Sequence, residues 1–309
     1  MNPADEVYPA PACEDRALSW SRTVARELVH RVSVAEVLLT DVRSAGGGRF
    51  EAASQWTRSH PTFPRGGDGR HHPLMVVETL RQLGIYVPLR YYGVDPDAHF
   101  LIRETSYALD PDAEPRAVDG ASDVVCEVAV SHVRTDPSGM VGGLRLTARF
   151  RHGGRPFAVA AGTARMLGAA RYRELRGPRV TAVPQDAAAP GQPRPGPGRL
   201  ALASPLDAML AHDGGAPLIS PADPWHPFFF DHGSDHVPGM VLLEAARQAA
   251  ALCGDGTRTR PVAGRLAALG FTELRPQARV YVLFHGRVAV FRVRHGDVLT
   301  AAGTLHYSE

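Results

Sequence analysis

The sequence predicts an α+β protein that carries two copies of one plan, each an antiparallel sheet wrapped around a single long helix. A repeated set of polar residues points to the two copies. It recurs at a constant offset of 166 positions, with His60, Glu78, Arg81 and Gln82 matched by His226, Glu244, Arg247 and Gln248. Chance rarely keeps one register over four polar positions, so we interpret the chain as an internal duplication. In each copy a helical apolar segment is followed by several strand-like segments, which favours a sheet packed on one helix.

The length of 309 residues suits two domains, each long enough to bury its own core. We expect a flexible tail at residues 1–20, a first domain at 21–183 and a second domain at 199–309. The segment 184–198 is rich in proline, glycine and alanine, so it is predicted to link the domains. The two copies should pair edge to edge as a pseudo-dimer, because each otherwise leaves one sheet edge unpaired. Whether pseudo-dimers pair further as a homodimer is left open.

The first copy begins with residues 29–42, which are β-branched and apolar and predict one long strand or two short ones. Residues 50–56 return as a strand after the Gly46-Gly47-Gly48 turn, which makes a hairpin. A helix then opens at Pro73, where proline is tolerated, and Pro88 closes or kinks it. Four further strands are expected at 100–109, 124–134, 144–151 and 156–166.

The second copy repeats this plan with weaker opening strands. Its loop and helix span residues 226–252, and strands are expected at 262–274, 280–285, 287–294 and 298–307. The helix from Met240 to Leu252 is apolar on nearly every side, which predicts that it is buried. Its strongly polar residues, Glu244, Arg247 and Gln248, share one face at spacings of three and four. Such groups are costly to bury unless they serve each other, a ligand or a partner chain.

Composition excludes several classes of function. All 34 basic residues are arginine, so no lysine Schiff base can form. A net charge of +2 with scattered arginines gives no nucleic-acid groove, and no apolar run approaches the roughly 20 residues of a membrane span. The three cysteines form no C-x-x-C pair, which favours reduced thiols in a cytoplasmic protein. No cofactor is expected.

The motif D-H-x-x-D-H-V-P-G-M-V-L-L-E-A-A-R-Q-A at 231–249 resembles the hotdog-fold acyl-thioester enzymes, whose dehydratases pair a catalytic His with a Glu. From His232 to Glu244 the spacing is two residues shorter than in those dehydratases. The segment V-H-R…E-V-L-L-T-D at 29–41 and E-T-L-R-Q in the first copy are more similar to the A-factor biosynthesis (AfsA-like) hotdog family. The resemblance covers both halves of the chain.

This resemblance implies a tandem hotdog synthase of γ-butyrolactone-type signal precursors in actinomycetes. Such enzymes transfer a β-ketoacyl group from an acyl carrier protein to the hydroxyl of dihydroxyacetone phosphate. The catalytic residues of the family fall on Glu78, Glu244 and Arg247. One departure is His72, which stands before Pro73 where family members usually carry Asp.

Acyl transfer needs a base, donors for the developing oxyanion and a group that holds the phosphate. Desolvation in an apolar helix would strengthen Glu244 as a base, and the alternative is a buried ion pair with Arg247 that fixes packing. Gly239 and Met240 open the helix with free N–H groups suited to the thioester oxygen. Arg247, or its counterpart Arg81, would clamp the phosphate, and Gln82 and Gln248 would line the substrate site.

The loop residues His232, Asp235 and His236 are predicted to contact substrate. One histidine would orient Glu244 or relay a proton, with Asp235 fixing its tautomer. A metal is not expected, because no fourth ligand is evident. Two alternative functions stay open, another acyl-thioester enzyme such as a dehydratase or thioesterase, and a non-catalytic protein that binds an acyl ligand.

Overall fold

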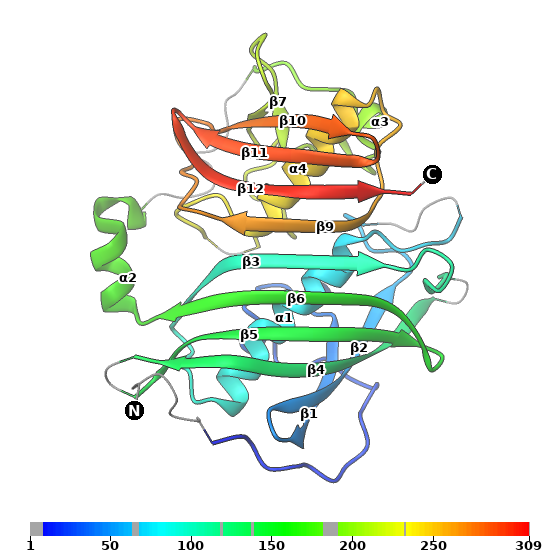
Figure 1. The fold of residues 1–309 in the computed structure, drawn as a ribbon, viewed down its shortest axis with the longest axis vertical. Coiled ribbons are helices and arrows are strands. Elements are labelled where there is room, and N and C mark those ends of the chain that lie inside the picture. The colour runs from blue at the N-terminus through cyan, green and yellow to red at the C-terminus, as the bar shows by residue number, and fades with distance from the viewer. Residues whose placement is uncertain are drawn as a thin grey trace. The chain divides into compact units, whose positions relative to one another are not determined.

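The structure is a computed structural model that describes residues 9–63, 68–117, 120–136, 139–181, 191–231 and 233–308. The chain forms two compact units. The first comprises Met1–Arg58 and Arg65–Leu175, and the second comprises Ser59–Pro64 and Arg176–Glu309. Each unit contains one sheet and one long helix (Figure 1). The first unit therefore ends before residue 183, and part of the predicted linker 184–198 lies outside the described residues.

The first unit is a six-stranded antiparallel sheet in the order β1-β2-β4-β5-β6-β3. Because β3 joins the far side of β6, the strands do not form a simple meander. The strands are β1 (Leu39–Gly46), β2 (Arg49–Thr57), β3 (His99–Leu109), β4 (Ala121–Thr135), β5 (Val141–His152) and β6 (Arg155–Leu167). The short helix α2 (Ala169–Arg176) follows β6. The strands predicted from 50 to 166 are confirmed, each with slightly longer bounds.

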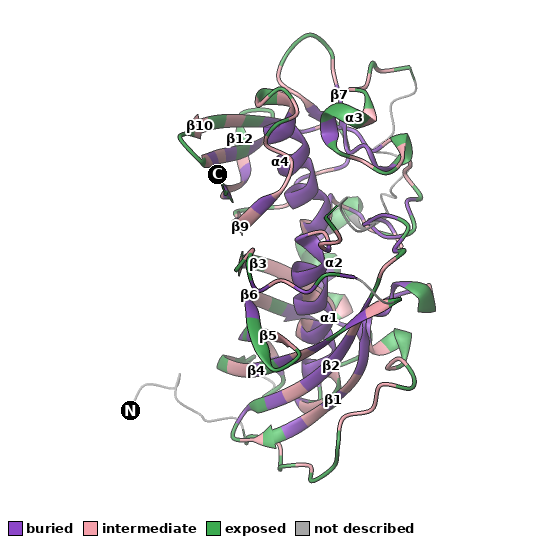
Figure 2. Cartoon of the chain, turned by 90° about the vertical axis from the view of Figure 1, so that its right-hand side faces the viewer, coloured by how far each residue is buried: buried purple, intermediate pink, exposed green. Residues whose placement is uncertain are grey.

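The central helix of the first unit is α1 (Leu74–Tyr91), and it is buried on nearly every side (Figure 2). It continues past Pro88 and ends three residues later, so this proline does not close it. The indole N–H of Trp56 donates to Thr79 on α1 at 3.0 Å. Trp56 also packs edge-on against Phe157 of β6, with ring centroids 5.6 Å apart. The helix is thus fixed to its sheet by apolar packing and by buried hydrogen bonds, among them the one from Trp56.

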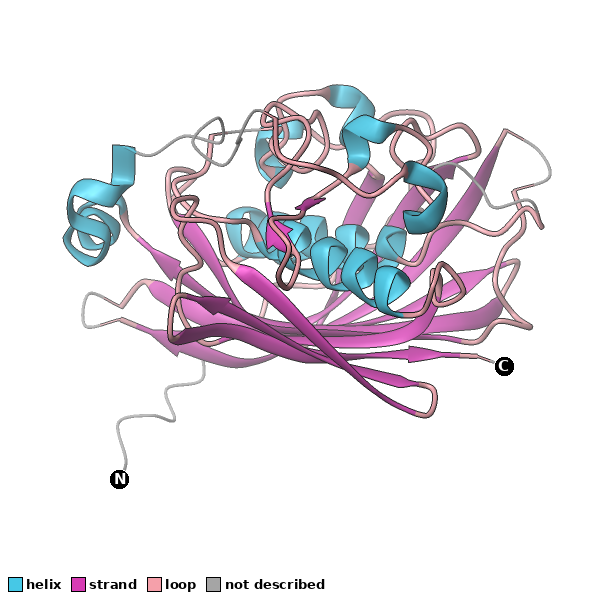
Figure 3. Ribbon diagram, turned by 90° about the horizontal axis from the view of Figure 1, so that it is seen from above, coloured by secondary structure: helices cyan, strands magenta, loops and turns pink. Residues whose placement is uncertain are grey.

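The second unit repeats the layers, with its long helix against one face of its sheet (Figure 3). The strand order is β9-β12-β11-β10-β8-β7, with every pair antiparallel. Strand β9 ends at Ala268 and not at residue 274 as predicted. The elements are α3 (Pro197–Leu200), β7 (Leu210–Ala211), β8 (Leu218–Ile219), α4 (Gly239–Cys253), β9 (Pro261–Ala268), β10 (Arg279–His285), β11 (Val288–His295) and β12 (Val298–Tyr307). The edge-to-edge pairing of the two copies stays a prediction.

The prediction of one long strand or two short ones at residues 29–42 is wrong before Leu39 and confirmed from Leu39 onward. The 3₁₀ turn η1 (Arg26–Val29) ends at the first residue of this segment, the 3₁₀ turn η2 (Val34–Glu36) lies inside it, and a strand begins only at Leu39. The reason is a local cap, because the hydroxyl of Ser33 accepts a hydrogen bond from the amide of Ala35 at 3.2 Å. The second copy has the same arrangement at η5 (Pro205–Asp207), where Ser204 and Asp207 form a reciprocal capping box.

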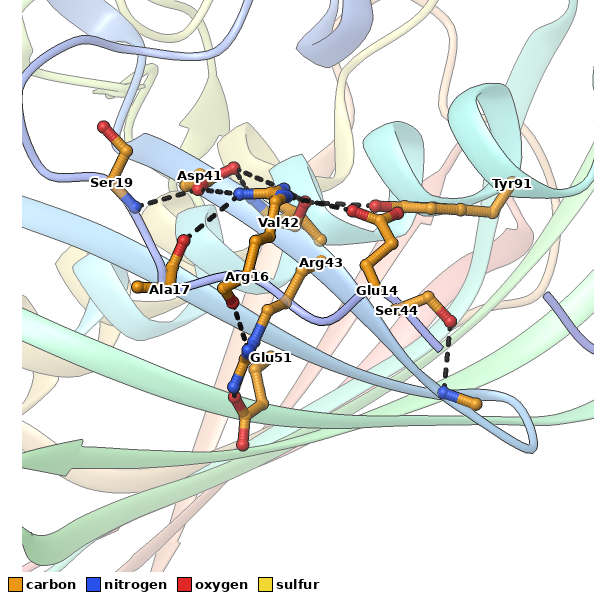
Figure 4. Close-up of polar contacts among 11 residues, drawn as sticks. Glu14, Arg16, Ala17, Ser19, Asp41, Val42, Arg43, Ser44, Glu51 and Tyr91 are labelled. Carbon is orange, nitrogen blue, oxygen red and sulfur yellow. Dashed lines mark hydrogen bonds and ion pairs between the residues drawn. The ribbon is translucent and has the colours of Figure 1, made fainter. Parts of the chain in front are cut away.

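The described part of the N-terminal segment, from residue 9, is held along β1 (Figure 4). Arg16 donates to both carboxylate oxygens of Asp41, at 2.5 and 2.9 Å. The amide of Ser19 donates to the same carboxylate at 2.8 Å, and the amide of Glu14 donates to the carbonyl of Ser44 at 2.8 Å. The prediction of a loose tail is therefore wrong for this part of the chain. No helix among the described residues has the length and hydropathy to cross a membrane.

Candidate active site

Glu78 lies at the centre of a buried ion-pair cluster in the first unit. Its Oε2 accepts a hydrogen bond from Nε of Arg81 at 2.8 Å, and its Oε1 accepts one from Nη2 of Arg81 at 2.9 Å. Arg31 lies 2.9 Å from the same Oε1, and Gln82 donates to it at 2.7 Å. The carboxylate of Glu78 is fully buried, and two guanidinium groups surround it.

These donors keep Glu78 ionised. Burial alone raises the pKa of a carboxyl group, but the charges of Arg31 and Arg81 and the hydrogen bonds from Arg81 and Gln82 outweigh it. They lower the pKa of Glu78 to about 2. Glu78 is therefore a weak base at neutral pH, because efficient general bases have pKa values near the working pH.

Glu244 has the equivalent position on α4. Its Oε2 accepts a hydrogen bond from Nε of Arg247 at 2.8 Å, and its Oε1 accepts one from Nη2 at 2.5 Å. Gln248 donates to the same Oε1 at 2.8 Å. The remaining nitrogen of Arg247, Nη1, donates to the carbonyls of Leu200 and Thr259, both at 3.0 Å. The side chains of Glu244, Arg247 and Gln248 are all buried, so the predicted cluster exists. Its members form hydrogen bonds chiefly with one another and with backbone groups.

Gln82 ties α1 to the segment that precedes β1. Its Nε2 donates to the carbonyl of Glu36 at 2.8 Å, and its Oε1 accepts from the amide of Leu38 at 2.9 Å. Arg81 reaches the same segment by donating to the carbonyl of Val29 at 3.3 Å. The polar face of α1 therefore holds the residues before β1 in place.

Gln248 makes the same pair of bonds in the second unit. Its Nε2 donates to the carbonyl of Asp207 at 2.9 Å, and its Oε1 accepts from the amide of Met209 at 2.8 Å. Asp207, Met209 and the Leu200 that Arg247 contacts lie 171 positions after Glu36, Leu38 and Val29. The duplication therefore extends to a segment whose sequences show little similarity, and the contacts rather than the residue types have been kept.

His226 and His60 stabilise turns. Nδ1 of His226 accepts hydrogen bonds from the two backbone amides that lie two and three residues further on. Its Nε2 lies 3.0 Å from Oδ1 of Asp207, and because Nδ1 accepts, Nε2 carries the proton that Asp207 accepts. Nδ1 of His60 accepts from two amides in the same manner.

The loop before α4 contains Asp235 and His236, whose Oδ1 and Nδ1 atoms lie 2.7 Å apart. The carboxylate of Asp235 also accepts from Nε of Arg176 at 2.8 Å. Asp235 therefore does contact a histidine, as predicted. His232, the third predicted residue of this loop, lies outside the described residues.

The two helix N-termini differ. Pro238 caps α4 with extended backbone and supplies no side chain to the amides of the first turn, where Gly239 and Met240 lie. In α1, Nδ1 of His72 accepts from the amide of Leu74 at 3.2 Å. His72 therefore satisfies the amide of the first residue of α1 from the position before its N-cap, Pro73.

Three contributors were not predicted from the sequence. Arg31 and Asp207 lie in segments expected to be strands or loop. The pattern Ser33-x-x-Glu36, just after Arg31, and the pattern Ser204-x-x-Asp207, which ends in Asp207, could have indicated capped turns. Arg176 gives no such signal, because its partner Asp235 lies 59 positions away. Among the residues that the structure describes, no three His, Cys, Asp or Glu side chains gather where they could hold a metal ion.

Comparison with known proteins gives this arrangement its context. A family model described as the A-factor biosynthesis hotdog domain matches residues 14–168 and 219–272. A 2-oxo-3-(phosphooxy)propyl 3-oxoalkanoate synthase from Streptomyces virginiae is 36% identical over 235 residues, which cover 74% of this chain and 76% of that protein. The synthase of the same name from Streptomyces coelicolor is 34% identical over 238 residues, covering 74% and 72%.

A solved structure, the 12:0-ACP thioesterase from Umbellularia californica, covers 83% of this chain and 97% of its own, at 11% identity and a TM-score of 0.48. The family match covers the strands and central helix of the first unit and the loop and helix of the second. The predicted hotdog fold is confirmed, and the chain belongs to the A-factor biosynthesis hotdog family.

Proposed function

We propose that this protein transfers a β-ketoacyl group from an acyl carrier protein thioester to the hydroxyl of dihydroxyacetone phosphate. This would be the first step towards a γ-butyrolactone-type signal. The observation that carries the proposal is the identity of 36% and 34% to two synthases over about three quarters of the chain. The product in their name is an ester of a 3-oxo acid with a phosphorylated three-carbon ketone.

The second unit offers the groups that such a reaction uses. The first-turn amides of Gly239 and Met240 would stabilise the negative charge that develops on the thioester oxygen. Arg247 would contribute positive charge beside the phosphate. Its Nε, Nη1 and Nη2 donate four hydrogen bonds within the protein, so most donors of the guanidinium are already engaged.

The catalytic roles of Glu78, Glu244 and Arg247 stay predictions. In both copies the carboxylate accepts two hydrogen bonds from the arginine three residues further on. Arg247 and Gln248 donate to the carboxylate oxygens of Glu244, so a substrate hydroxyl would have to share an oxygen with one of them. The contacts of these residues equally support the packing role of a buried ion pair.

Mass spectrometry of the products tests the proposed function. The purified protein is mixed with a β-ketoacyl carrier protein and dihydroxyacetone phosphate, and we expect a phosphorylated β-keto ester together with free carrier thiol. Glu244→Gln should lower ester formation at least tenfold, whereas Glu174→Gln, at an exposed position of α2, should not.

Other products would identify the alternatives. Free β-keto acid without ester would make the protein a thioesterase, and an enoyl product would make it a dehydratase. Acyl-ligand binding with no turnover would make it a binding protein.

A further inference from the structure

Four charged or titratable side chains of the second unit form one connected cluster beside the N-terminus of α4. They are Arg176, Asp235, His236 and Glu273. Arg176 donates from Nε to Oδ2 of Asp235, and from Nη1 and Nη2 to the two carboxylate oxygens of Glu273, all at 2.8 Å. Nη2 of Arg176 also donates to the backbone carbonyl of Asp235 at 2.8 Å.

Arg176 is built into the protein as a fixed charge. Only 2% of its side chain is exposed, and its guanidinium lies 4.2 Å from the ring centroid of Phe271. Burial would lower the pKa of Arg176, but hydrogen bonds to Glu273 and Asp235 raise it above its usual value. The same contact lowers the pKa of Glu273 against the effect of burial. The cluster therefore places a permanent positive charge behind Asp235.

This charge fixes the protonation pattern of the pair formed by Asp235 and His236. Oδ2 of Asp235 accepts from Arg176, which favours the ionised carboxylate. Its Oδ1 then accepts from Nδ1 of His236 at 2.7 Å, so Nδ1 carries a proton and the basic lone pair of the neutral ring lies on Nε2. This is the arrangement by which a buried carboxylate orients a histidine for proton transfer.

The position of His236 is fixed on several sides. The hydroxyl of Ser234 donates to its carbonyl at 2.7 Å, and the amide of Val237 donates to the carbonyl of Thr272 at 2.8 Å. The imidazole packs edge-on against Phe271, with ring centroids 4.9 Å apart. The side chain of His236 is 24% exposed, whereas that of Asp235 is 7% exposed. The imidazole is therefore held firmly and yet reaches the surface two residues before Pro238.

We propose that His236 is the catalytic base of the acyl transfer and that Asp235 and Arg176 are its positioning residues. The inference rests on the proposed function. Nε2 takes the proton of the acceptor hydroxyl as the hydroxyl oxygen forms a bond to the thioester carbon. The carbon–sulfur bond then breaks, and His236 returns the proton to the departing thiolate, which gives ester and carrier thiol with no other reactant.

A base at His236 removes a difficulty of the site. Glu78 has a pKa of about 2, and Glu244 accepts two hydrogen bonds from Arg247, whereas an imidazole exchanges protons near neutral pH. His236 also precedes the first turn of α4 by only a few residues, where the amides proposed to stabilise the oxyanion lie. Base and oxyanion donors would thus come from one continuous segment.

The test measures kcat and KM for ester formation between pH 5 and 9, with a β-ketoacyl N-acetylcysteamine thioester and dihydroxyacetone phosphate. For the wild type, kcat/KM should rise with pH to a plateau. His236→Asn should lower the plateau about a hundredfold or more and remove the rise. His306→Asn, at an exposed histidine of β12, is the matched control and should match the wild type.

Substitutions of Asp235 and Arg176 should each change the kinetics in a distinct way. Asp235→Asn removes a negative charge beside the imidazole, so the midpoint of the profile should move to lower pH while kcat falls about tenfold or more. Among the described residues, the charges that contact this cluster include Arg176, Glu273 and Arg179, which lies 3.7 Å from Glu273, and they stay in this variant. Arg176→Lys should lower kcat more than it changes KM, whereas Arg292→Lys on the exposed part of β11 should change neither.

The role of His236 and the proposed acyl transfer can fail independently. Ester formation by the wild type with an unchanged plateau and profile in folded His236→Asn would overturn the role of His236 and leave the proposed function standing. No ester from the wild type would overturn both. Circular dichroism tests whether each variant is folded. If His236→Asn does not fold, the shift of the pH profile in Asp235→Asn decides, because lost packing alone would not move the midpoint of the profile.

Discussion

Arg31 lies 2.9 Å from the carboxylate of Glu78, and the equivalent position of the second copy, 171 residues further on, is Leu202. Glu78 is thus paired with two arginines, whereas Glu244 is paired with Arg247 among the described residues. The two copies keep the same carboxylate and glutamine but differ in the positive charge that surrounds them.

Arg31→Leu should destabilise the protein. The substitution leaves the buried carboxylate of Glu78 with Arg81 as its charged partner, and losing a hydrogen-bonded charge in a buried pair costs about 1.5–3 kcal/mol. Urea unfolding at pH 7 measures the change. Arg26→Leu is the control, because Arg26 is exposed and contacts the exposed Glu27 and the carbonyl of Val32, and it should shift stability by less than about 0.5 kcal/mol. Equal effects of the two substitutions would contradict the buried pair.

Glu78 should contribute a pH-dependent part of stability. The pKa of Glu78 is about 2 in the folded protein and about 4.3 in an unfolded chain, so the unfolded state binds the proton more tightly. Its contribution is therefore complete above about pH 5 and is lost as the pH falls towards 2. Unfolding by urea between pH 7 and pH 2.5 should show the gap between wild type and Glu78→Gln narrowing with acid. A gap that stays constant, as expected for exposed Glu174→Gln, would refute this assignment.

Gln248→Ala should lower the free energy of unfolding by about 3 kcal/mol. The side chain makes three buried hydrogen bonds, and its loss leaves the amide of Met209 and the carbonyl of Asp207 without this partner. Gln82→Ala should behave alike in the first unit. Gln55→Ala, which removes one exposed hydrogen bond to Asp123, is the control for both. If thermal unfolding shows that substitution of Gln82 or Gln248 lowers stability no more than substitution of Gln55, the buried hydrogen bonds of these two glutamines do not stabilise the fold.

Gly303→Ala should prevent the second unit from folding. A Cβ atom at this position of β12 would lie 1.9 Å from the carbonyl oxygen of Arg265 and 2.5 Å from Cζ of Phe291. Both contacts are shorter than any packing tolerates, so β12 would have to separate from its neighbours. Gly270→Ala is the control, because a Cβ added at Gly270 would meet no atom within 4 Å apart from its chain neighbours. Soluble expression and circular dichroism compare the two, and equal yields would contradict the close approach at Gly303.

The repeated helices and most strands could be predicted because their signals are local. Residues 240–252 are apolar at most positions. Strand-like segments such as 144–151 alternate between apolar and polar residues and are bounded by glycines. The strand prediction failed for the residues before Leu39 for a physical reason. Their β-branched composition favours a strand, but the hydroxyl of Ser33 accepts a hydrogen bond from the amide of Ala35 and stabilises a 3₁₀ turn instead.

The site was predictable only in part. Glu244, Arg247 and Gln248 share a face because helical spacing dictates it, so their clustering follows from the sequence. The partners of this face, Leu200 and Asp207, and the contact of Arg176 with Asp235 depend on how distant segments pack. Nothing local in the sequence encodes such contacts.

The opening hairpins of the two copies have diverged in length. Strands β1 and β2 have 8 and 9 residues, whereas β7 and β8 have 2 residues each. In both copies a glutamine of the long helix, Gln82 or Gln248, binds the backbone of the segment before the hairpin. The second copy could therefore lose most of its hairpin and still keep these hydrogen bonds to its helix. After duplication, one copy could then conserve architecture while the other was free to vary the loop that carries Asp235 and His236. Two identical single-copy subunits would have no such freedom, because each substitution would alter both subunits at once.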